Sequence, residues 1–281
     1  MKASEVVTEQ LIPVLKVEGE TVPEVWENAV IQCWEQGISI RTEYDKKDDP
    51  PSKDCSMVMV IRSPLAEPRI HRAFPGGLGD LEVYRQEVID GIHDDWINPD
   101  EGKWSYTYHE RLFHYPYGDE KIDQVAYIVN KLAEAPHTRR AQAITWNVKS
   151  DHVVEDPPCL QRLWCRLMEA EEGFTLNMSG HWRSRDAYKA AFMNLFALTD
   201  LMKIIGERLE ERLSKPVRLG RYAEFVDSFH IYGSYFKEFE GFLGTVKKRK
   251  FEDRVWETKF AEPFFAEARE KLKAEASQAR A

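Results

Sequence analysis

Residues 155–167 read EDPPCLQRLWCRL, and this stretch decides how the middle of the chain folds. Two prolines stand directly before Cys159, so the chain is not helical there and enters the following apolar run in an extended form. That run, LQRLWCRLM (160–168), has the character of a strand. The stretch alone leaves open whether Cys159 is a reactive thiol or a small buried core residue.

Strands and helices are expected to alternate around this run. Strand patterns occur at 55–64, 141–148, 174–182 and 222–235, and helical patterns occur at 22–36, 81–92, 121–136 and 184–213. A charged tail, expected to be a fraying helix, begins at about Phe251. No repeat or flexible linker interrupts these patterns, so we expect one mixed α/β (α+β) domain over residues 1–281.

Bulk composition excludes several classes of protein. The 281 residues carry a formal net charge of −9, which argues against non-specific binding to nucleic acid. No signal peptide and no run of about 18 apolar residues is present, so we expect a cytoplasmic protein without a membrane span. The four cysteines include no C-x-x-C pair. We therefore expect free thiols and no metal site.

Charged and polar side chains gather where the strand at 174–182 is expected to pass into a helix. Arg183, Ser184 and Asp186 stand there, and a phosphate could be held by the first two beside a helix N-terminus. An ordinary helix cap would use the same residue types. Asn194, further along, is either a buried amide that pins a base or a plain helix residue. A cation close to Cys159 would favour its thiolate.

The order of these pieces resembles the thymidylate synthase and pyrimidine-nucleotide hydroxymethylase family, from about residue 41 to about residue 235. Six motifs carry the resemblance: IRTE (40–43), TRRAQAITWNV (138–148), DPPC (156–159), WRSRD (182–186), MN (193–194) and DSFHIY (227–232). The resemblance implies a single large mixed sheet with flanking helices, and a homodimer whose sheets pack together.

The resemblance also implies a covalent mechanism and a role for each motif. The Cys159 thiolate would add to C6 of a pyrimidine monophosphate, so that C5 attacks the one-carbon unit of methylenetetrahydrofolate. Arg183 would bind the phosphate and lower the pKa of the thiol. The other roles implied are phosphate binding by Arg41 and Ser184, and by Arg139 and Arg140 of the partner subunit; base binding by Asn194; sugar binding by His230 and Tyr232; and pterin binding by Asp186.

Proton transfer in this family needs a carboxylate and a tyrosine. The segment RQEVIDGI resembles the helix that carries the family's glutamate, which points to Glu87, with Glu82 as the rival. Tyr106 resembles the tyrosine that assists proton removal from C5. Surface or core roles for Glu87 and Tyr106 remain open. His93 stands where the family carries a tryptophan against the folate, so it is our candidate on the cofactor side.

Departures from the family pattern leave the final step open. His93 replaces the tryptophan, Leu160 replaces the histidine after the nucleophile, and AEASQARA at the end does not resemble the short apolar closing tail. A wetter site would hydrate the exocyclic methylene instead of reducing it. We expect methylation of dUMP to dTMP, because the amide of Asn194 suits uracil. The alternatives are 5-hydroxymethylation of dUMP or of a cytidine nucleotide, and a non-catalytic nucleotide-binding relative.

Overall fold

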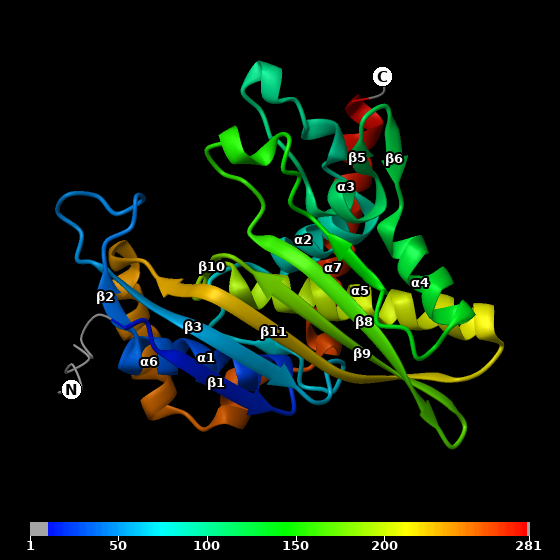
Figure 1. The fold of residues 1–281 in the computed structure, drawn as a ribbon. Helices are drawn as coiled ribbons and strands as arrows, with labels where there is room; N and C mark the ends of the chain where they lie inside the picture. The colour runs from blue at the N-terminus through cyan, green and yellow to red at the C-terminus, as the bar shows by residue number, and fades with distance from the viewer. Residues whose placement is uncertain (1–10, 280–281) are drawn as a thin grey trace, which may run out of the picture.

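The computed structural model describes residues 11–279, and its central feature is an eight-stranded mixed sheet (Figure 1). The strand order is β1-β3-β11-β9-β8-β7, with β2 pairing β3 and β10 pairing β11. The strands are β1 (Val14–Gly19), β2 (Ile38–Ile40), β3 (Ser52–Ile61), β7 (Gln142–Ile144), β8 (Leu160–Ala170), β9 (Gly173–Trp182), β10 (Arg185–Asp186) and β11 (Val217–Ile231).

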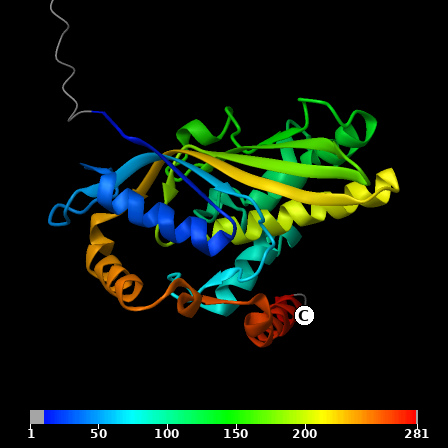
Figure 2. The same ribbon diagram turned by 90° about the horizontal axis from the view of Figure 1, so that it is seen from below.

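Helices form two layers on one side of this sheet (Figure 2). Helices α1 (Val22–Gln36) and α5 (Ala191–Leu213) lie against the strands. Beyond them lie α2 (Leu78–Asp90), α6 (Phe236–Lys248) and α7 (Thr258–Ala279), together with the short pair β4 (Ile70–His71) and β12 (Val255–Trp256). Helices α3 (Tyr108–Phe113) and α4 (Gln124–Glu134) flank the hairpin of β5 (Tyr115–Tyr117) and β6 (Glu120–Ile122) near the β7 edge.

The core fills the space between the sheet and the inner helices. Trp26 of α1 is fully buried, and its ring packs edge-on against Phe192 at 5.3 Å and Phe242 at 5.5 Å. Along β9 every second side chain is buried, which is the period-two pattern of a strand with one face in the core.

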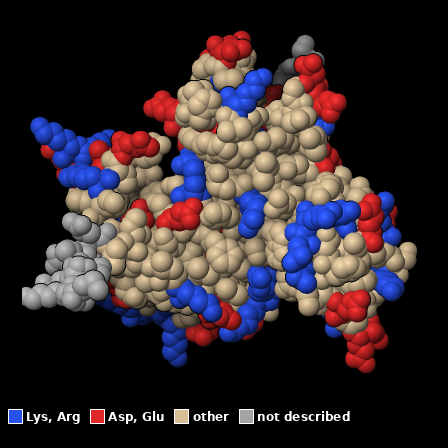
Figure 3. Space-filling view, in the orientation of Figure 1, with Lys and Arg blue, Asp and Glu red and all other residues tan. Residues whose placement is uncertain are grey.

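The opposite face of the sheet is more exposed. Met168 on β8 and Phe225 on β11 retain 50% and 47% exposure. In the view that looks onto the sheet, most of the surface belongs to uncharged residues, with Lys and Arg scattered across it (Figure 3).

The expected mixed α/β class is confirmed, and α1 has the predicted limits. Several predicted limits differ: the last strand, expected at 222–235, is β11 at Val217–Ile231, and the helix expected in the tail from about Phe251 begins at Thr258. The helix expected from residue 184 begins at Ala191. Arg185 and Asp186 instead pair in parallel with Phe229 and His230 as β10. Arg183 and Ser184 therefore lie on the turn between two strands and not at a helix N-terminus. None of the helices within residues 11–279 is both long and apolar enough to cross a lipid bilayer.

Candidate active site

A cleft of about 540 Å³ opens beside the start of β8 and brings together side chains from six segments of the chain. Seven of the residues singled out from sequence line it: Cys159, Arg183, Ser184, Asp186, Asn194, His230 and Tyr232. These residues span 74 positions of sequence. They come together because the paired strands of the sheet and the first turn of α5 meet at the same place.

The prolines before Cys159 serve as a fixed pair of hydrogen-bond acceptors. Arg183 donates through Nε to the carbonyl of Pro158 (3.1 Å) and through Nη2 to the carbonyl of Pro157 (2.7 Å). Its backbone N–H donates to the carbonyl of Cys159 (2.9 Å). The extended proline entry and the guanidinium therefore hold the thiol at the strand start.

Burial and the charge of Arg183 change the pKa of the Cys159 thiol in opposite directions. Burial raises the pKa of Cys159 above its usual value, Asp156 adds to that rise, and Arg183 opposes it. Arg183 acts in the expected direction, but the net change in this structure is upward. A phosphate bound by Arg183 would not correct this, so activation of the thiol also depends on where its proton goes.

Arg185 differs from Arg183 because it is a structural residue. Its side chain is buried, pairs with Glu224 and donates to the carbonyl of Ala191 (3.0 Å). It also lies over the ring of Trp182 at 4.2 Å. These contacts join β10, β11 and the start of α5.

Asn194 lies in the first turn of α5 and is 8% exposed. Its Nδ2 donates to the hydroxyl of Tyr84 on α2 at 2.5 Å. Tyr84 also lines the cleft. Sequence reasoning missed it, since its helical pattern resembles that of any half-buried tyrosine and its partner lies 110 residues away.

His230 and Asp186 stand side by side on paired strands. His230 is 4% exposed, and its ring packs edge-on against Tyr232 at 4.5 Å. Burial lowers the pKa of His230 to about 4. Asp186 accepts from the backbone N–H groups of Tyr188 (3.0 Å) and Lys189 (2.9 Å), and burial raises the pKa of its carboxyl.

A second cavity of about 600 Å³ contains Glu87 and Tyr106. Tyr108, Glu155 and Asp156 line both cavities, so the two are neighbours. The backbone N–H of Leu160 donates to the hydroxyl of Tyr108 (3.1 Å), which places this tyrosine beside Cys159. The sequence prediction names Tyr106. The segment YTYHER contains both tyrosines, however, and does not show which of the two fills the predicted role.

Glu87 and His93 form a hydrogen-bonded pair. The Oε2 of Glu87 lies 2.9 Å from Nδ1 of His93, and the His93 ring stacks on Trp96 at 3.8 Å. Gly91 ends α2 in the left-handed region (φ 67°), which turns the chain back toward Glu87. Burial raises the pKa of Glu87, and His93 opposes that rise. His93 is not among the residues that line either cavity.

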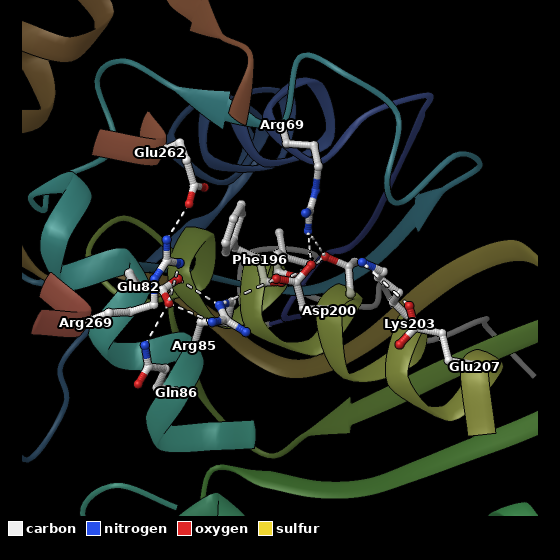
Figure 4. Close-up of polar contacts among 12 residues, drawn as sticks. Arg69, Glu82, Arg85, Gln86, Phe196, Asp200, Lys203, Glu207, Glu262 and Arg269 are labelled. Carbon is white, nitrogen blue, oxygen red and sulfur yellow. Dashed lines mark hydrogen bonds and ion pairs between the residues drawn. The ribbon is translucent and has the colours of Figure 1, made fainter. Parts of the chain in front are cut away.

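Glu82, the rival carboxylate, occupies a different cavity of about 420 Å³ between α2, α5 and α7 (Figure 4). It is 1% exposed and accepts from Arg85 (2.6 and 2.8 Å), Gln86 (2.8 Å) and Arg269 (3.2 Å). Its oxygens are thus occupied by a structural network.

Three predicted arginines lie outside the Cys159 cleft of their own chain. Arg41 is exposed and donates to the carbonyl of Lys46 (3.2 Å), three residues before the cleft residue Tyr44. Arg139 and Arg140 are exposed and line a separate hollow of about 490 Å³ with Lys131 and His137. The structure does not bring these three together with the nucleophile within one chain.

One group of side chains has the composition of a metal site. Ligand atoms of Asp94, His109 and His114 all lie within 4.8 Å of one another. Both carboxylate oxygens of Asp94 are already engaged, because Thr107 donates to Oδ1 (2.5 Å) and Nδ1 of His109 lies 2.7 Å from Oδ2. These contacts fix the start of α3 against the segment after α2.

A half-buried thiol beside a guanidinium, with a buried amide and a carboxylate close by, is suited to covalent catalysis on a small polar ligand. Comparison with known proteins agrees with this class of site. The family model for thymidylate synthase matches residues 80–258. The putative thymidylate synthase of Methanopyrus kandleri is 32% identical over 196 residues, which cover 69% of this chain and 84% of that protein.

Two further comparisons extend the likeness. The putative thymidylate synthase of Methanocaldococcus jannaschii is 29% identical over 224 residues, covering 78% of this chain and 90% of that protein. The solved structure of thermostable thymidylate synthase A from Bacillus subtilis shares the fold with a TM-score of 0.57 at 18% identity, covering 78% and 83% of the two chains. The chain belongs to the thymidylate synthase family, whose members bind a nucleotide and use methylenetetrahydrofolate.

Proposed function

We propose that this protein transfers a one-carbon unit from methylenetetrahydrofolate to C5 of a pyrimidine nucleoside monophosphate, with methylation of dUMP to dTMP as the reaction. The observation that carries the proposal is the cleft in which Cys159, Arg183, Asn194 and His230 meet. Each of these four side chains has a chemical task in that reaction.

Covalent chemistry would begin at Cys159. Its thiolate adds to C6 of the ring, and the added electron pair makes C5 a nucleophile. Arg183 binds the phosphate with Ser184 and Arg41 and supplies positive charge near sulfur. Because burial raises the pKa of the thiol, proton loss and addition to C6 would be coupled to nucleotide binding.

Base recognition would depend on Asn194. With one N–H committed to Tyr84, its Oδ1 and second N–H remain for the N3–H and O4 of uracil. The sugar would contact His230 and Tyr232.

Methylenetetrahydrofolate would supply the one-carbon unit when bound. The cavity beside the nucleophile suits a flat ring system, since Trp104, Tyr106 and Tyr108 contribute to its walls. Glu87 lies in that cavity and would hold the proton and water needed at the base edge, with Tyr106 or Tyr108 at C5. Asp186 would bind the pterin, and His93 would act on this side through Glu87.

Hydroxymethylation is the second candidate, and the pairing of Glu87 with His93 favours it. Glu87 at this wall, hydrogen-bonded to His93 behind it, would keep water close to the place where the exocyclic methylene would form. Attack by water would give a hydroxymethyl product from dUMP, or from a cytidine nucleotide if Asn194 presents its amide reversed.

We further propose a single domain over residues 1–281 that works as a homodimer with shared sites. The half-exposed sheet face with Met168 and Phe225 offers apolar surface to a second copy. Arg139 and Arg140 stand free of the cleft in their own chain and would reach the phosphate in the partner.

The test is mass analysis of products from purified enzyme, methylenetetrahydrofolate and each of dUMP, dCMP and CMP. A methylated uracil product supports the proposal, a hydroxymethyl product promotes the second candidate, and nucleotide binding without any product points to a non-catalytic relative.

Cys159→Ser should abolish turnover while nucleotide binding persists, since a hydroxyl ionises far less readily than a thiol. Cys165→Ser is the matched control, because that thiol is fully buried in β8 and outside the cleft.

A further inference from the structure

Three residues form a hydrogen-bonded row behind the sugar end of the cleft. His230 on β11 is the cross-strand partner of Asp54 on β3, and Ser228 precedes His230 by two positions. The hydroxyl of Ser228 donates to Oδ2 of Asp54 at 2.6 Å. Asp54 is 6% exposed, so this contact is shielded from solvent. Neither Asp54 nor Ser228 lines the cleft itself.

The directions of these hydrogen bonds define where the His230 proton sits. Nδ1 of His230 lies 3.3 Å from the backbone carbonyl of Ser228 and 3.3 Å from its Oγ. A carbonyl oxygen only accepts, so Nδ1 must donate to it. The hydroxyl proton of Ser228 is committed to Asp54, which leaves Oγ as a second acceptor for the same N–H.

The other ring nitrogen then has no proton. Burial lowers the pKa of His230 to about 4, with Arg183 lowering it and Asp45 raising it, so the ring is neutral at neutral pH. A neutral imidazole with its proton on Nδ1 presents a bare lone pair at Nε2.

That lone pair is unsatisfied in the described part of the chain. Nε2 of His230 is buried and has no hydrogen-bond partner, while the residue lines the cleft. A buried acceptor without a partner is unfavourable, and a ligand hydroxyl is the group that would satisfy it.

We propose that Asp54 and Ser228 are positioning residues that lock His230 in the Nδ1–H tautomer, so that Nε2 accepts a hydrogen bond from a hydroxyl group of the ligand. The identity of that hydroxyl as the sugar 3′-hydroxyl rests on the proposed function, whereas the tautomer does not. The site should therefore favour a ligand that donates at this position over one that lacks the hydroxyl.

The first experiment measures the tautomer directly. Nitrogen-15 NMR of histidine-labelled full-length protein without ligand, with His230 assigned through His230→Gln, should show a protonated Nδ1 and a bare Nε2 at pH 7. Ser228→Ala keeps the backbone carbonyl but removes the second acceptor of Nδ1, so it should raise the fraction of the Nε2–H tautomer. Ser228→Thr, which keeps the hydroxyl, should resemble the wild type. A proton on Nε2 in the wild-type protein would overturn the proposal.

The second experiment measures the consequence for binding. Calorimetry should show dUMP binding about tenfold tighter than 2′,3′-dideoxyuridine monophosphate, and Ser228→Ala should reduce that ratio to within about twofold. Ser56→Ala is the matched control, because Ser56 lies on β3 outside the cleft and donates to the carbonyl of Asp227 (2.8 Å). An undiminished ratio in Ser228→Ala overturns the positioning role. Failure of both nucleotides to bind would contradict the proposed function, while the NMR result still decides the tautomer.

Discussion

The pKa values of three side chains at or behind the cleft depend more on burial than on neighbouring charge. The thiol of Cys159 has a raised pKa despite Arg183, and His230 has a lowered pKa despite Asp45, in each case because burial is the largest cause. Asp54 shows the same effect, since burial raises its pKa from 3.8 to about 6 even though Ser228 donates to it. Burial therefore shifts the titration of each of these three groups toward its neutral form.

The raised pKa of the buried Asp54 carboxyl predicts how the stability of the protein changes with pH. Because its pKa is higher in the folded state, the folded protein binds more protons than the unfolded chain between pH 4 and 6, so this group costs stability as pH rises. A shift from 3.8 to about 6 corresponds to about 3 kcal/mol. Relative to Asp54→Asn, the wild type should therefore lose about 2 kcal/mol of stability between pH 4 and pH 7, because the rest is already lost at pH 4.

Urea unfolding of both proteins at pH 4, 5, 6 and 7 measures this difference. His230 has the opposite dependence, with stability lost as pH falls from 6.5 toward 4, but it is present in both proteins and cancels. If the difference in unfolding free energy between the two proteins stays constant over this range, burial does not raise the pKa of Asp54 in the folded state.

Sequence could single out residues that the structure brings together in the cleft, but not the residues that support them. Cys159, Arg183 and Asn194 stand in motifs with local character, so the sequence alone singles them out. Asp54 could not be found in this way, because its partner Ser228 lies 174 positions away and meets it only through the pairing of β3 with β11. Tyr84 was missed for the same reason.

Elements were predictable where one face of a regular pattern is buried. Helix α1 follows its apolar stripe from Val22 to Gln36, whereas β1 is half exposed along its length and gave no pattern. The start of α5 was misplaced because sheet pairing of Arg185 and Asp186 with β11 overrides the helical periodicity of the residues that follow.

Helix α7 is attached to the glutamate-bearing helix α2 through a network of ion pairs (Figure 4). Arg85 holds buried Glu82 with two hydrogen bonds, while Arg269 of α7 is 33% exposed and makes one at 3.2 Å. Arg85→Met should cost about 3 kcal/mol of unfolding free energy, because it removes the main partner of a buried charge. Arg269→Met should cost about 1 kcal/mol or less.

Urea denaturation at neutral pH measures both values, and Lys271→Met on the exposed face of α7 serves as the control. Adding Glu82→Gln to Arg85→Met should recover part of the loss, since no buried charge then remains unpaired. Equal losses from Arg85→Met and Arg269→Met would contradict this account of the network.

At the scale of the whole molecule, the chain carries a nucleophile cleft and a detached pair of arginines. Arg139 and Arg140 precede β7 at the end of the strand order, whereas Arg183, the proposed phosphate ligand in the cleft, follows β9. Two-fold packing through the half-exposed sheet face would give each cleft a pair of arginines from the other subunit, by the same contact in both directions.

Subunit mixing tests this arrangement. Cys159→Ser lacks the nucleophile and Arg140→Ala lacks a residue donated to the partner, so each homodimer should be inactive or strongly impaired. A mixed dimer contains one cleft in which the intact Cys159 of one subunit meets the intact Arg140 of the other. Mixing equal amounts under conditions of subunit exchange should therefore restore about one quarter of wild-type activity, because half of the dimers are mixed and each has one complete site.

Exchange is followed independently with differently tagged subunits, and mixing Cys159→Ser with Cys159→Ala is the control that should stay inactive. Activity that does not recover in a mixture with demonstrated mixed dimers would mean that Arg140 acts within its own chain or not at all.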